Sequence, residues 1–391
     1  RDKLVTGVQT CALPILLSGQ GRTDDHAARV CGGVYAEAGS GDQGIDALQI
    51  IYISTNGPPL PPPRLVRRPY LQSGTTTNIV IRWRTSRETD SRVQFGLAAD
   101  TLLWSIEDAA LTKDHSLTLT NLLPDTEYFY AVGSGETNYA GGPEYHFFTA
   151  PTNTRPVRIW ALSDYGTTDN PYGYQENSAG VRDAYYTYTG SRRTDVWLTM
   201  GDNSQSAGTD AQYQTEVFDV YPAMLRQNVI WPTIGNHDAA YFPTSFDYLE
   251  IFSPPTQGEA GGVPSNSKFY YSYDYANIHF VNLDSITAYP RTNEAMLAWL
   301  ERDLAANTKD WLIAYWHAPP YTYGTHNSDN PADTWGAMVD MREVVLPILE
   351  AHGVDLVLNG HSHVYERSYL LDGHYGYGRD LRPGMIKNSG T

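Results

Sequence analysis

The chain has 391 residues, with 44 acidic and 27 basic side chains and a formal net charge of −17. That length predicts two or three domains, and 41% hydrophobic with 18% charged residues excludes wholesale disorder. The acidic balance argues against nucleic acid as a stable partner, and no apolar run approaches the roughly 18 residues of a membrane span. The two cysteines, Cys11 and Cys31, exclude a disulfide framework and a thiolate zinc cluster.

Residues 1–63 are predicted to precede the folded domains. Residues 1–15, RDKLVTGVQTCALPI, match the translation of a short-read sequencing adapter, so we expect them to be adapter-derived. The alternative is a remnant signal region at Ala12–Leu17, which is short and interrupted by a proline. Residues 16–63 are interpreted as a lead-in and a linker, because they end in the proline-rich run at 57–63.

Short alternating apolar and polar segments recur over residues 64–150, separated by turn sequences such as LPD and GGP. This pattern of short alternating segments and turns is typical of an antiparallel β-sandwich. The predicted strands are Ile79–Thr85, Ser91–Phe95, Ser116–Thr120, Glu127–Val132 and Tyr145–Thr149.

Residues 151–391 show a different pattern. Short apolar runs are each followed by polar residues, and segments with helical periodicity lie between several of these runs. Strand, polar tip and helix in this order predict an α/β layered domain. Two helices are expected, at Glu294–Leu304 and at Met341–His352 with Gly353 as its C-cap. The predicted strands are Val157–Leu162, Val196–Met200, Val229–Ile234, Ile278–Leu283, Trp311–Trp316 and Val354–Leu358.

Metal-capable side chains follow most of these strands. Strand tips converge at the carboxyl edge of an α/β sheet, and carboxylate, amide and imidazole together suit Zn, Mn or Fe. Two ions about 3.5–4 Å apart need a bridging ligand, which a carboxylate provides. A lone strand-end histidine is usually structural, so the prediction depends on the ordered combination DxG…GD…GNHD…H…GHxH. Its members are Asp164, Asp202, Asn236, His237, His317, His361 and His363.

This combination resembles the calcineurin-like metallophosphoesterase superfamily, over about residues 64–371. The segments RPYLQ and LLPDTEYFY, with Trp83, resemble the fibronectin type III-like domain that precedes its purple acid phosphatase-like branch. The resemblance implies a four-layer α/β/β/α domain after the sandwich. It also implies that Asp202 bridges two metal ions. Asp164 and His363 would complete the first site, and the second would be completed by Asn236, His317 and His361.

The same resemblance implies three residues beside the substrate. His237 would contact the phosphate and Asp238 would orient it. His326, nine residues after His317, stands where the family often carries a further substrate-side histidine.

One position departs from the family pattern GDxxY, whose tyrosine coordinates ferric iron. This chain has GDNSQ, which places Gln205 there. Loss of a phenolate should shift preference toward divalent ions. We therefore expect a colourless protein with two metal ions, Zn, Mn or Fe(II).

The other histidines are predicted to lie outside the site. His279 is expected in the core, and the tyrosines of Tyr270–Tyr275 are expected to serve packing. Surface or loop positions are expected for His26, His115, His146, His352 and His374.

These observations predict a secreted or periplasmic enzyme that hydrolyses phosphate monoesters by attack of metal-activated hydroxide on phosphorus. Its partner would be a small phosphorylated substrate. Two alternatives stay open: a phosphodiesterase or nucleotide hydrolase at the same site, and a non-catalytic binding protein whose site is degenerate at Gln205. The resemblance also implies a further strand beyond the C-terminal segment, so truncation there is expected. Metal identity, substrate and oligomeric state are not determined by the sequence.

Overall fold

The fold was analysed in a computed structural model that describes residues 61–387, apart from 136, 167–176, 206 and 240–246. The predictions of adapter-derived residues, a lead-in and most of the linker lie outside the described residues, as do those for Cys11, Cys31 and His26.

The N-terminal region forms the expected antiparallel sandwich. Two strands that were predicted separately, Ile79–Thr85 and Ser91–Phe95, are one strand, β2 (Ile79–Gly96). Irregular register between Arg84 and Ser91 bends β2, so its first part pairs with β1 and its second part pairs with β4. The other strands are β1 (Leu65–Gln72), β3 (Trp104–Leu119), β4 (Glu127–Ser134), β5 (Thr137–Ala140) and β6 (His146–Phe148).

Two sheets form the centre of the α/β domain. One contains three parallel strands, β7 (Ile159–Leu162), β8 (Val196–Thr199) and β9 (Ile230–Pro232). The other has the order β10-β11-β12-β13, with β10 antiparallel and the rest parallel. Its strands are β10 (Tyr271–Tyr275), β11 (Ile278–Asn282), β12 (Trp311–Tyr315) and β13 (Leu356–Leu358).

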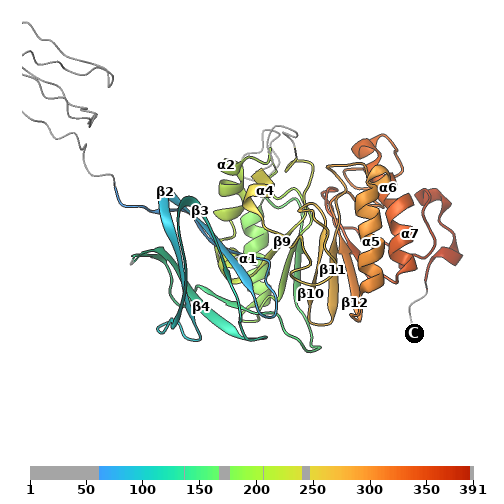
Figure 1. The fold of residues 1–391 in the computed structure, drawn as a ribbon. Helices are drawn as coiled ribbons and strands as arrows, with labels where there is room; N and C mark the ends of the chain where they lie inside the picture. The colour runs from blue at the N-terminus through green and yellow to red at the C-terminus, as the bar shows by residue number, and fades with distance from the viewer. Residues whose placement is uncertain (1–60, 136, 167–176, 206, 240–246, 388–391) are drawn as a thin grey trace, which may run out of the picture. The chain divides into compact units, whose positions relative to one another are not determined.

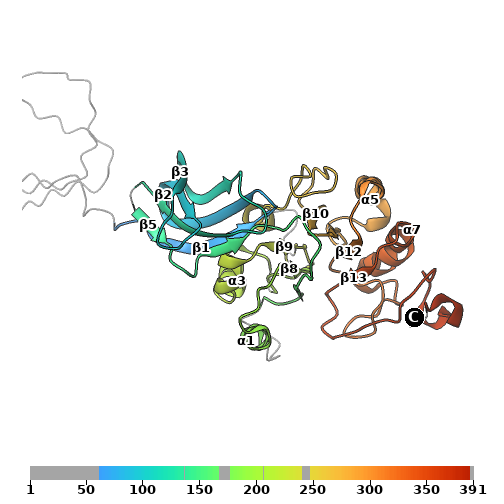
Figure 2. The same ribbon diagram turned by 90° about the horizontal axis from the view of Figure 1, so that it is seen from below.

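The sheets pack face to face and helices cover both outer faces (Figures 1 and 2). Leu198, Trp231 and Phe280 belong to the core between the sheets. This arrangement confirms the four-layer α/β/β/α prediction. One outer face is covered by α1 (Ser178–Thr189), α2 (Asp210–Tyr213), η1 (Gln214–Phe218), α3 (Pro222–Gln227) and α4 (Asp247–Ile251). The other is covered by α5 (Glu294–Ala306), η4 (Met341–Val345) and α7 (Leu346–Ala351). The remaining short helices are η2 (Pro290–Thr292), η3 (Asp333–Gly336), α6 (Ala337–Asp340), η5 (Gly378–Asp380) and η6 (Pro383–Met385).

One of the two predicted helices is confirmed and the other is corrected. Helix α5 covers the predicted range and begins after Asn293, whose side chain caps it. The helix expected over Met341–His352 is present and ends before Gly353, which has φ 73°, but its first part is the π-helix η4 rather than an α-helix. Pro347 has no N–H for a carbonyl four residues earlier, and the turn before it widens so that Leu346 N bonds to the carbonyl of Met341.

Two of the histidines for which surface or loop positions were expected are buried. His115 lies inside the sandwich, stacked on Trp83 with ring centroids 4.7 Å apart, and hydrogen-bonds to Thr85 and Ser91. The expectation failed because β3 alternates inward and outward residues, and polar partners on β2 accommodate the ring. His374 lies in a loop, as expected, but is buried against Tyr321. His279 lies in the core, as predicted.

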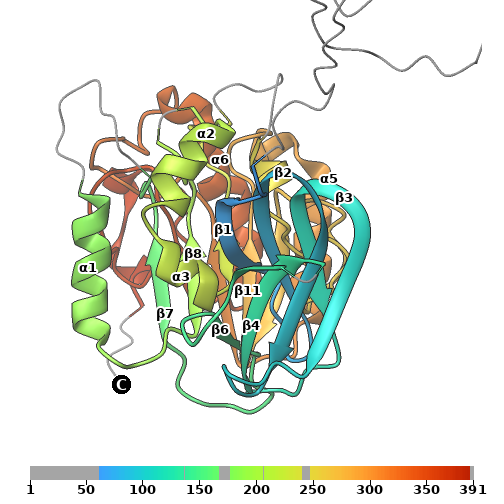
Figure 3. The ribbon, with the colours of Figure 1, turned by 90° about the vertical axis from the view of Figure 1, so that its left-hand side faces the viewer.

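The sandwich and the α/β domain belong to one compact unit that begins at Pro63. The sandwich lies against the helices that cover the three-stranded sheet (Figure 3). Arg67 is buried and donates to Asp210 and Gln214, and Tyr70 donates its hydroxyl proton to the carbonyl of Ile251. No helix among the described residues has the length and apolar character needed to cross a membrane.

Candidate metal centre and active site

The predicted site residues follow strand ends at one edge of the two sheets. Asp164, Asp202 and His361 all have positive φ angles, of 52°, 46° and 69°. Such conformations are costly for residues other than glycine and gather at functional sites. Gly201 has φ 89°, and a glycine is needed there because a side chain would clash with its neighbour. A Cβ there would lie 2.5 Å from His317 Nδ1.

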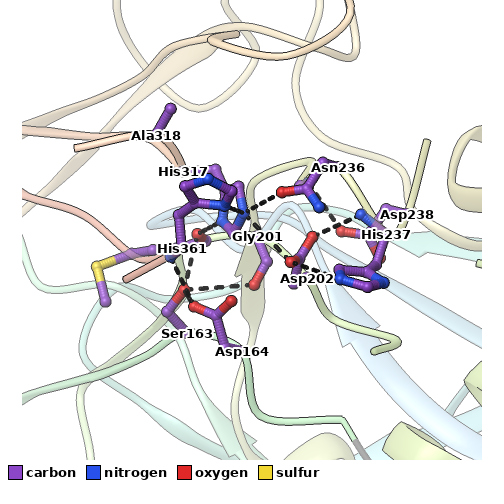
Figure 4. A network of polar contacts seen from close by, with 12 residues as sticks. Ser163, Asp164, Gly201, Asp202, Asn236, His237, Asp238, His317, Ala318 and His361 are labelled. Atoms are coloured by element: carbon purple, nitrogen blue, oxygen red, sulfur yellow. Dashed lines mark hydrogen bonds and ion pairs between the residues drawn. The ribbon is translucent and has the colours of Figure 1, made fainter. Parts of the chain in front are cut away.

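Asp202 occupies the middle of this group (Figure 4). Its Oδ2 atom lies 3.3 Å from His317 Nε2 and 3.9 Å from His237 Nε2. Its Oδ1 atom accepts a hydrogen bond of 2.8 Å from the backbone N–H of His237. The carboxylate is buried, so its charge is held in place by these neighbours rather than by bulk water.

His317 and His361 each use one ring nitrogen outside the centre. His317 Nδ1 donates to the carbonyl of Met200 at 2.8 Å. His361 Nε2 lies 2.8 Å from Thr334 Oγ1, whose own proton goes to Asp333, so the imidazole is the donor. The remaining nitrogens, His317 Nε2 and His361 Nδ1, face each other at 3.2 Å. Fixing one nitrogen this way directs the other toward a cation.

Asn236 completes this group, because its Oδ1 lies 3.0 Å from His317 Nε2. Burial alone would lower the pKa of His317, but the Asp202 and Asp164 carboxylates raise it to about 9. Burial and the neighbouring His317 and His326 lower the pKa of His361 to about 3. The raised pKa of His317 indicates that the surrounding carboxylates favour positive charge at this position.

Asp164 lies next to this group. Its Oδ2 accepts hydrogen bonds from the backbone N–H of His361 at 2.8 Å and from the Ser163 hydroxyl at 2.5 Å. Its Oδ1 lies 3.3 Å from His363 Nε2. Burial opposes ionisation of Asp164, yet His363 and His317 hold its pKa well below the usual range. The His363 side chain is about half exposed.

Asp238 links, through hydrogen bonds to its carboxylate, the loops that carry Asp202 and Asn236. Its carboxylate accepts hydrogen bonds from the backbone N–H groups of Asn203, Ser204 and Gly235, and from the Tyr213 hydroxyl at 2.5 Å. Burial and the neighbouring Asp202 charge raise the pKa of Asp238 to about 6. These bonds fix the backbone on both sides of the site. Orientation of His237 by Asp238 stays a prediction.

A pocket of about 370 Å³ opens over the site. His237 lines it with a partly exposed side chain. His326 also lines it, stacks on His361 with ring centroids 3.9 Å apart, and bonds through Nδ1 to Asp333 at 2.9 Å. Thr334 and Trp335 line the same pocket, and neither was predicted from the sequence because no motif or periodicity marks them.

Gln205 lies near the first half of the site through its backbone. Its N–H contacts the carbonyl of Gly166 and the carboxylate of Glu216, each at 2.8 Å. Its side-chain Nε2 is buried without a hydrogen-bond partner among the described residues.

The donor set fits metal ions. Ligand atoms of Asp202, His317 and His361 all lie within 4.8 Å of one another, and all three residues are buried. Carboxylate, imidazole and amide oxygen suit borderline divalent metals, and the two facing imidazole nitrogens are oriented for one. A second such group, formed by His326, Asp333 and His361, overlaps the first.

Comparison with known proteins decides the family. The profile of the calcineurin-like phosphoesterases matches residues 157–365, which is more than half of the chain. The chain belongs to this family. The purple acid phosphatase N-terminal domain matches residues 66–149, which form the sandwich. The family is one of metal-dependent hydrolases, in agreement with the expected enzyme class.

Individual relatives agree with the family match. The chain is 31% identical over 260 residues to purple acid phosphatase 18 of Arabidopsis thaliana, covering 66% of this chain and 53% of that relative. It is 26% identical over 320 residues to purple acid phosphatase 1 of Ipomoea batatas, covering 77% and 60%. The chain spans about half the length of curated relatives such as purple acid phosphatase 18.

A solved structure of PhoD shares the fold. The TM-score is 0.55 at 13% identity, and the match covers 75% of this chain and 71% of PhoD.

Proposed function

We propose that this protein hydrolyses phosphate monoesters with two divalent metal ions. Asp164 and His363 would hold the first ion, and Asn236, His317 and His361 the second, with Asp202 shared. The observation that supports the proposal is the position of buried Asp202, whose carboxylate lies 3.3 Å from His317 Nε2 and offers a ligand atom within 4.8 Å of those of His317 and His361. Two ions held there would supply charge neutralisation for the ester and lower the pKa of an attacking water.

The residues around this centre have separable roles in the proposal. The His237 backbone N–H holds Asp202, and its partly exposed imidazole faces the pocket. That ring would hold a phosphoryl oxygen or give a proton to the leaving group. Asp333 would set the protonated nitrogen of His326, because it bonds to Nδ1 and leaves Nε2 for the substrate.

Metal stoichiometry of the full chain tests the proposal, together with hydrolysis of an aryl phosphate. We expect close to two metals per chain in the parent and a clear loss of metal and hydrolysis in Asp202→Ala. The control is Asp183→Ala, since Asp183 is an exposed carboxylate on α1. Full activity in Asp202→Ala would show that the dimetal assignment is wrong. One metal or none in a folded parent would favour the binding-protein alternative.

The phosphodiesterase alternative uses the same ligands, so the two activities must be separated by substrate. Turnover of an aryl monoester is compared with that of the corresponding diester under identical metal loading. The proposal requires a higher kcat/KM for the monoester.

Metal preference is proposed to follow from Gln205. A neutral amide stabilises a trivalent ion less than a phenolate does, so divalent ions should be favoured and the loaded protein should be colourless. Gln205→Tyr in the iron-loaded protein should introduce a visible charge-transfer band, whereas Gln205→Phe should not. A strong visible band in the parent would contradict this.

Secretion or export to the periplasm is proposed on family likeness alone. Phosphatase activity in the extracytoplasmic fraction of the source cells would support it, and confinement of the protein to the cytoplasm would contradict it.

A further inference from the structure

We propose that Trp335 is a stacking platform at the pocket mouth that selects phosphate esters whose leaving group carries a planar aromatic ring, such as an aryl group or the base of a nucleoside. This inference rests on the proposed function and specifies the substrate class of the same site.

The composition of the pocket wall points to this role. The described residues that line it include Asp202, Asn236 and His237, and Trp335 is the only large apolar side chain among them. Its surface is 68% exposed, although an indole ring gains free energy from being covered. Ligand sites combine a few convergent polar groups with apolar surface that the ligand covers. Here the polar groups match a phosphoryl group, and the indole is the one large apolar surface among the described lining residues for the rest of the substrate.

The backbone shows that this exposure is imposed by the fold. Thr334 has φ 48° and ψ 36°, Trp335 has φ 53° and ψ 25°, and Gly336 has φ 84°. Left-handed conformations are uncommon for non-glycine residues and unusual for a β-branched residue such as threonine. Two of them in succession store strain, which persists only where surrounding contacts over-determine the conformation.

The contacts that hold this turn come from the site itself. Thr334 Oγ1 accepts the hydrogen bond of 2.8 Å from His361 Nε2 and donates to Asp333 at 3.1 Å. Asp333 in turn accepts from the backbone N–H of Asn327 and from His326 Nδ1, each at 2.9 Å. Trp335 is therefore one residue away from the side chain that orients a proposed metal ligand. That linkage places the backbone of Trp335 relative to His361.

The geometry separates two classes of ester. With the phosphoryl group at the polar end of the pocket, the leaving group meets the indole. A planar aromatic group can stack on it, which is worth roughly 10–100-fold in binding, whereas a small polyol offers no π-face. Orthophosphate has no leaving group, so Trp335 should not affect its binding.

Steady-state kinetics of the metal-loaded full chain test this proposal, with phenyl phosphate, a nucleoside 5′-monophosphate and glycerol 2-phosphate as substrates. Trp335→Ala is expected to raise KM about 10–100-fold for the two planar substrates and less than about 3-fold for glycerol 2-phosphate. Trp335→Phe should restore most of the difference. Competitive inhibition by orthophosphate should be unchanged in both variants.

Two further variants separate stacking from structure. Trp335→Gly relieves the strained φ, so it should raise the melting temperature and still lose the selectivity. Trp311→Ala is the matched control, because Trp311 is also exposed but lies at the opposite end of its strand from the site. It should leave the ratio of KM values at its parental level.

The outcomes distinguish this inference from the proposed function. An equal loss for planar and polyol substrates, or no change for either, would overturn the role of Trp335 while leaving hydrolysis intact. If the parent hydrolyses no ester, the proposed function fails, and calorimetry with a nucleoside monophosphate and ribose 5-phosphate then tests the platform alone. Tighter binding of the nucleotide that is lost in Trp335→Ala supports stacking. Equal binding of the two ligands overturns it.

Discussion

Buried histidines occur in two regions of the same sheet, and their surroundings differ. His279, within β11, has a carboxylate on each ring nitrogen: Asp274 on Nδ1 at 2.7 Å and Asp303 on Nε2 at 2.8 Å. His317 and His361, beyond the ends of β12 and β13, each use one nitrogen on the scaffold and point the other at a neighbouring ligand.

The difference shows what separates a structural histidine from a ligand. Burial would lower the pKa of His279, but its two carboxylates raise it to about 9, so it is a charged and fully paired core residue. His361 instead has a pKa lowered to about 3, so the lone pair of its Nδ1 atom is unprotonated at neutral pH. Burial therefore does not distinguish them, and the identity of the partner at the second nitrogen does: for His279 it is a carboxylate within the core, and for His317 and His361 it is another candidate ligand.

The largest expected effect comes from replacing one histidine of each kind, the candidate ligand His317 and the core residue His279. His317→Ala should lose about one metal per chain and reduce kcat/KM at least about 100-fold, because a ligand and the partner of Asp202 disappear together. His279→Gln should retain both metals and lose stability. Elemental analysis and thermal melts of both variants measure this. Retention of two metals in His317→Ala would remove the distinction.

A smaller effect is expected at the hydroxyl that orients His361. Thr334→Val keeps the shape but leaves His361 Nε2 without its acceptor, which should weaken binding of one metal about 10–100-fold. Thr334→Ser keeps the hydroxyl and should bind metal as the parent does. Metal titration of the apoprotein measures both. An unchanged affinity in Thr334→Val would show that the ring is oriented by packing alone.

The smallest effect concerns the charged partner of His279. Since the folded-state pKa of about 9 lies above the unfolded value, its stabilisation is complete below pH 6.5 and is lost as the pH rises through 9. Asp274→Asn should therefore cost about 1–2 kcal/mol of unfolding free energy near pH 6 and little above pH 9. Denaturant titrations at both pH values measure this. A loss independent of pH would show that His279 is uncharged.

Much of the architecture could be predicted from the sequence, because the local pattern of apolar and polar residues agrees with the strands that the structure shows. The six predicted strands of the α/β domain all occur, each shorter than its apolar run, and the ligand candidates begin two to four residues after the strands end. The long β2 was divided in the prediction because its bend interrupts the alternation of residues. The π-helix at Met341 was missed because its cause is a proline six residues later.

The candidate site was likewise predictable where it depends on local sequence, and not where it depends on residues far away in the chain. The sequence by itself determined which polar residues stand at strand tips, since apolar runs must end where the sheet edge meets solvent. It could not determine which imidazole nitrogen faces inward, because Met200 and Thr334, which decide this, lie far from His317 and His361 in the chain. Only the tertiary structure placed Trp335 over the pocket. Its left-handed turn is held by side chains that reach it from other loops, and no local preference of the sequence favours that conformation.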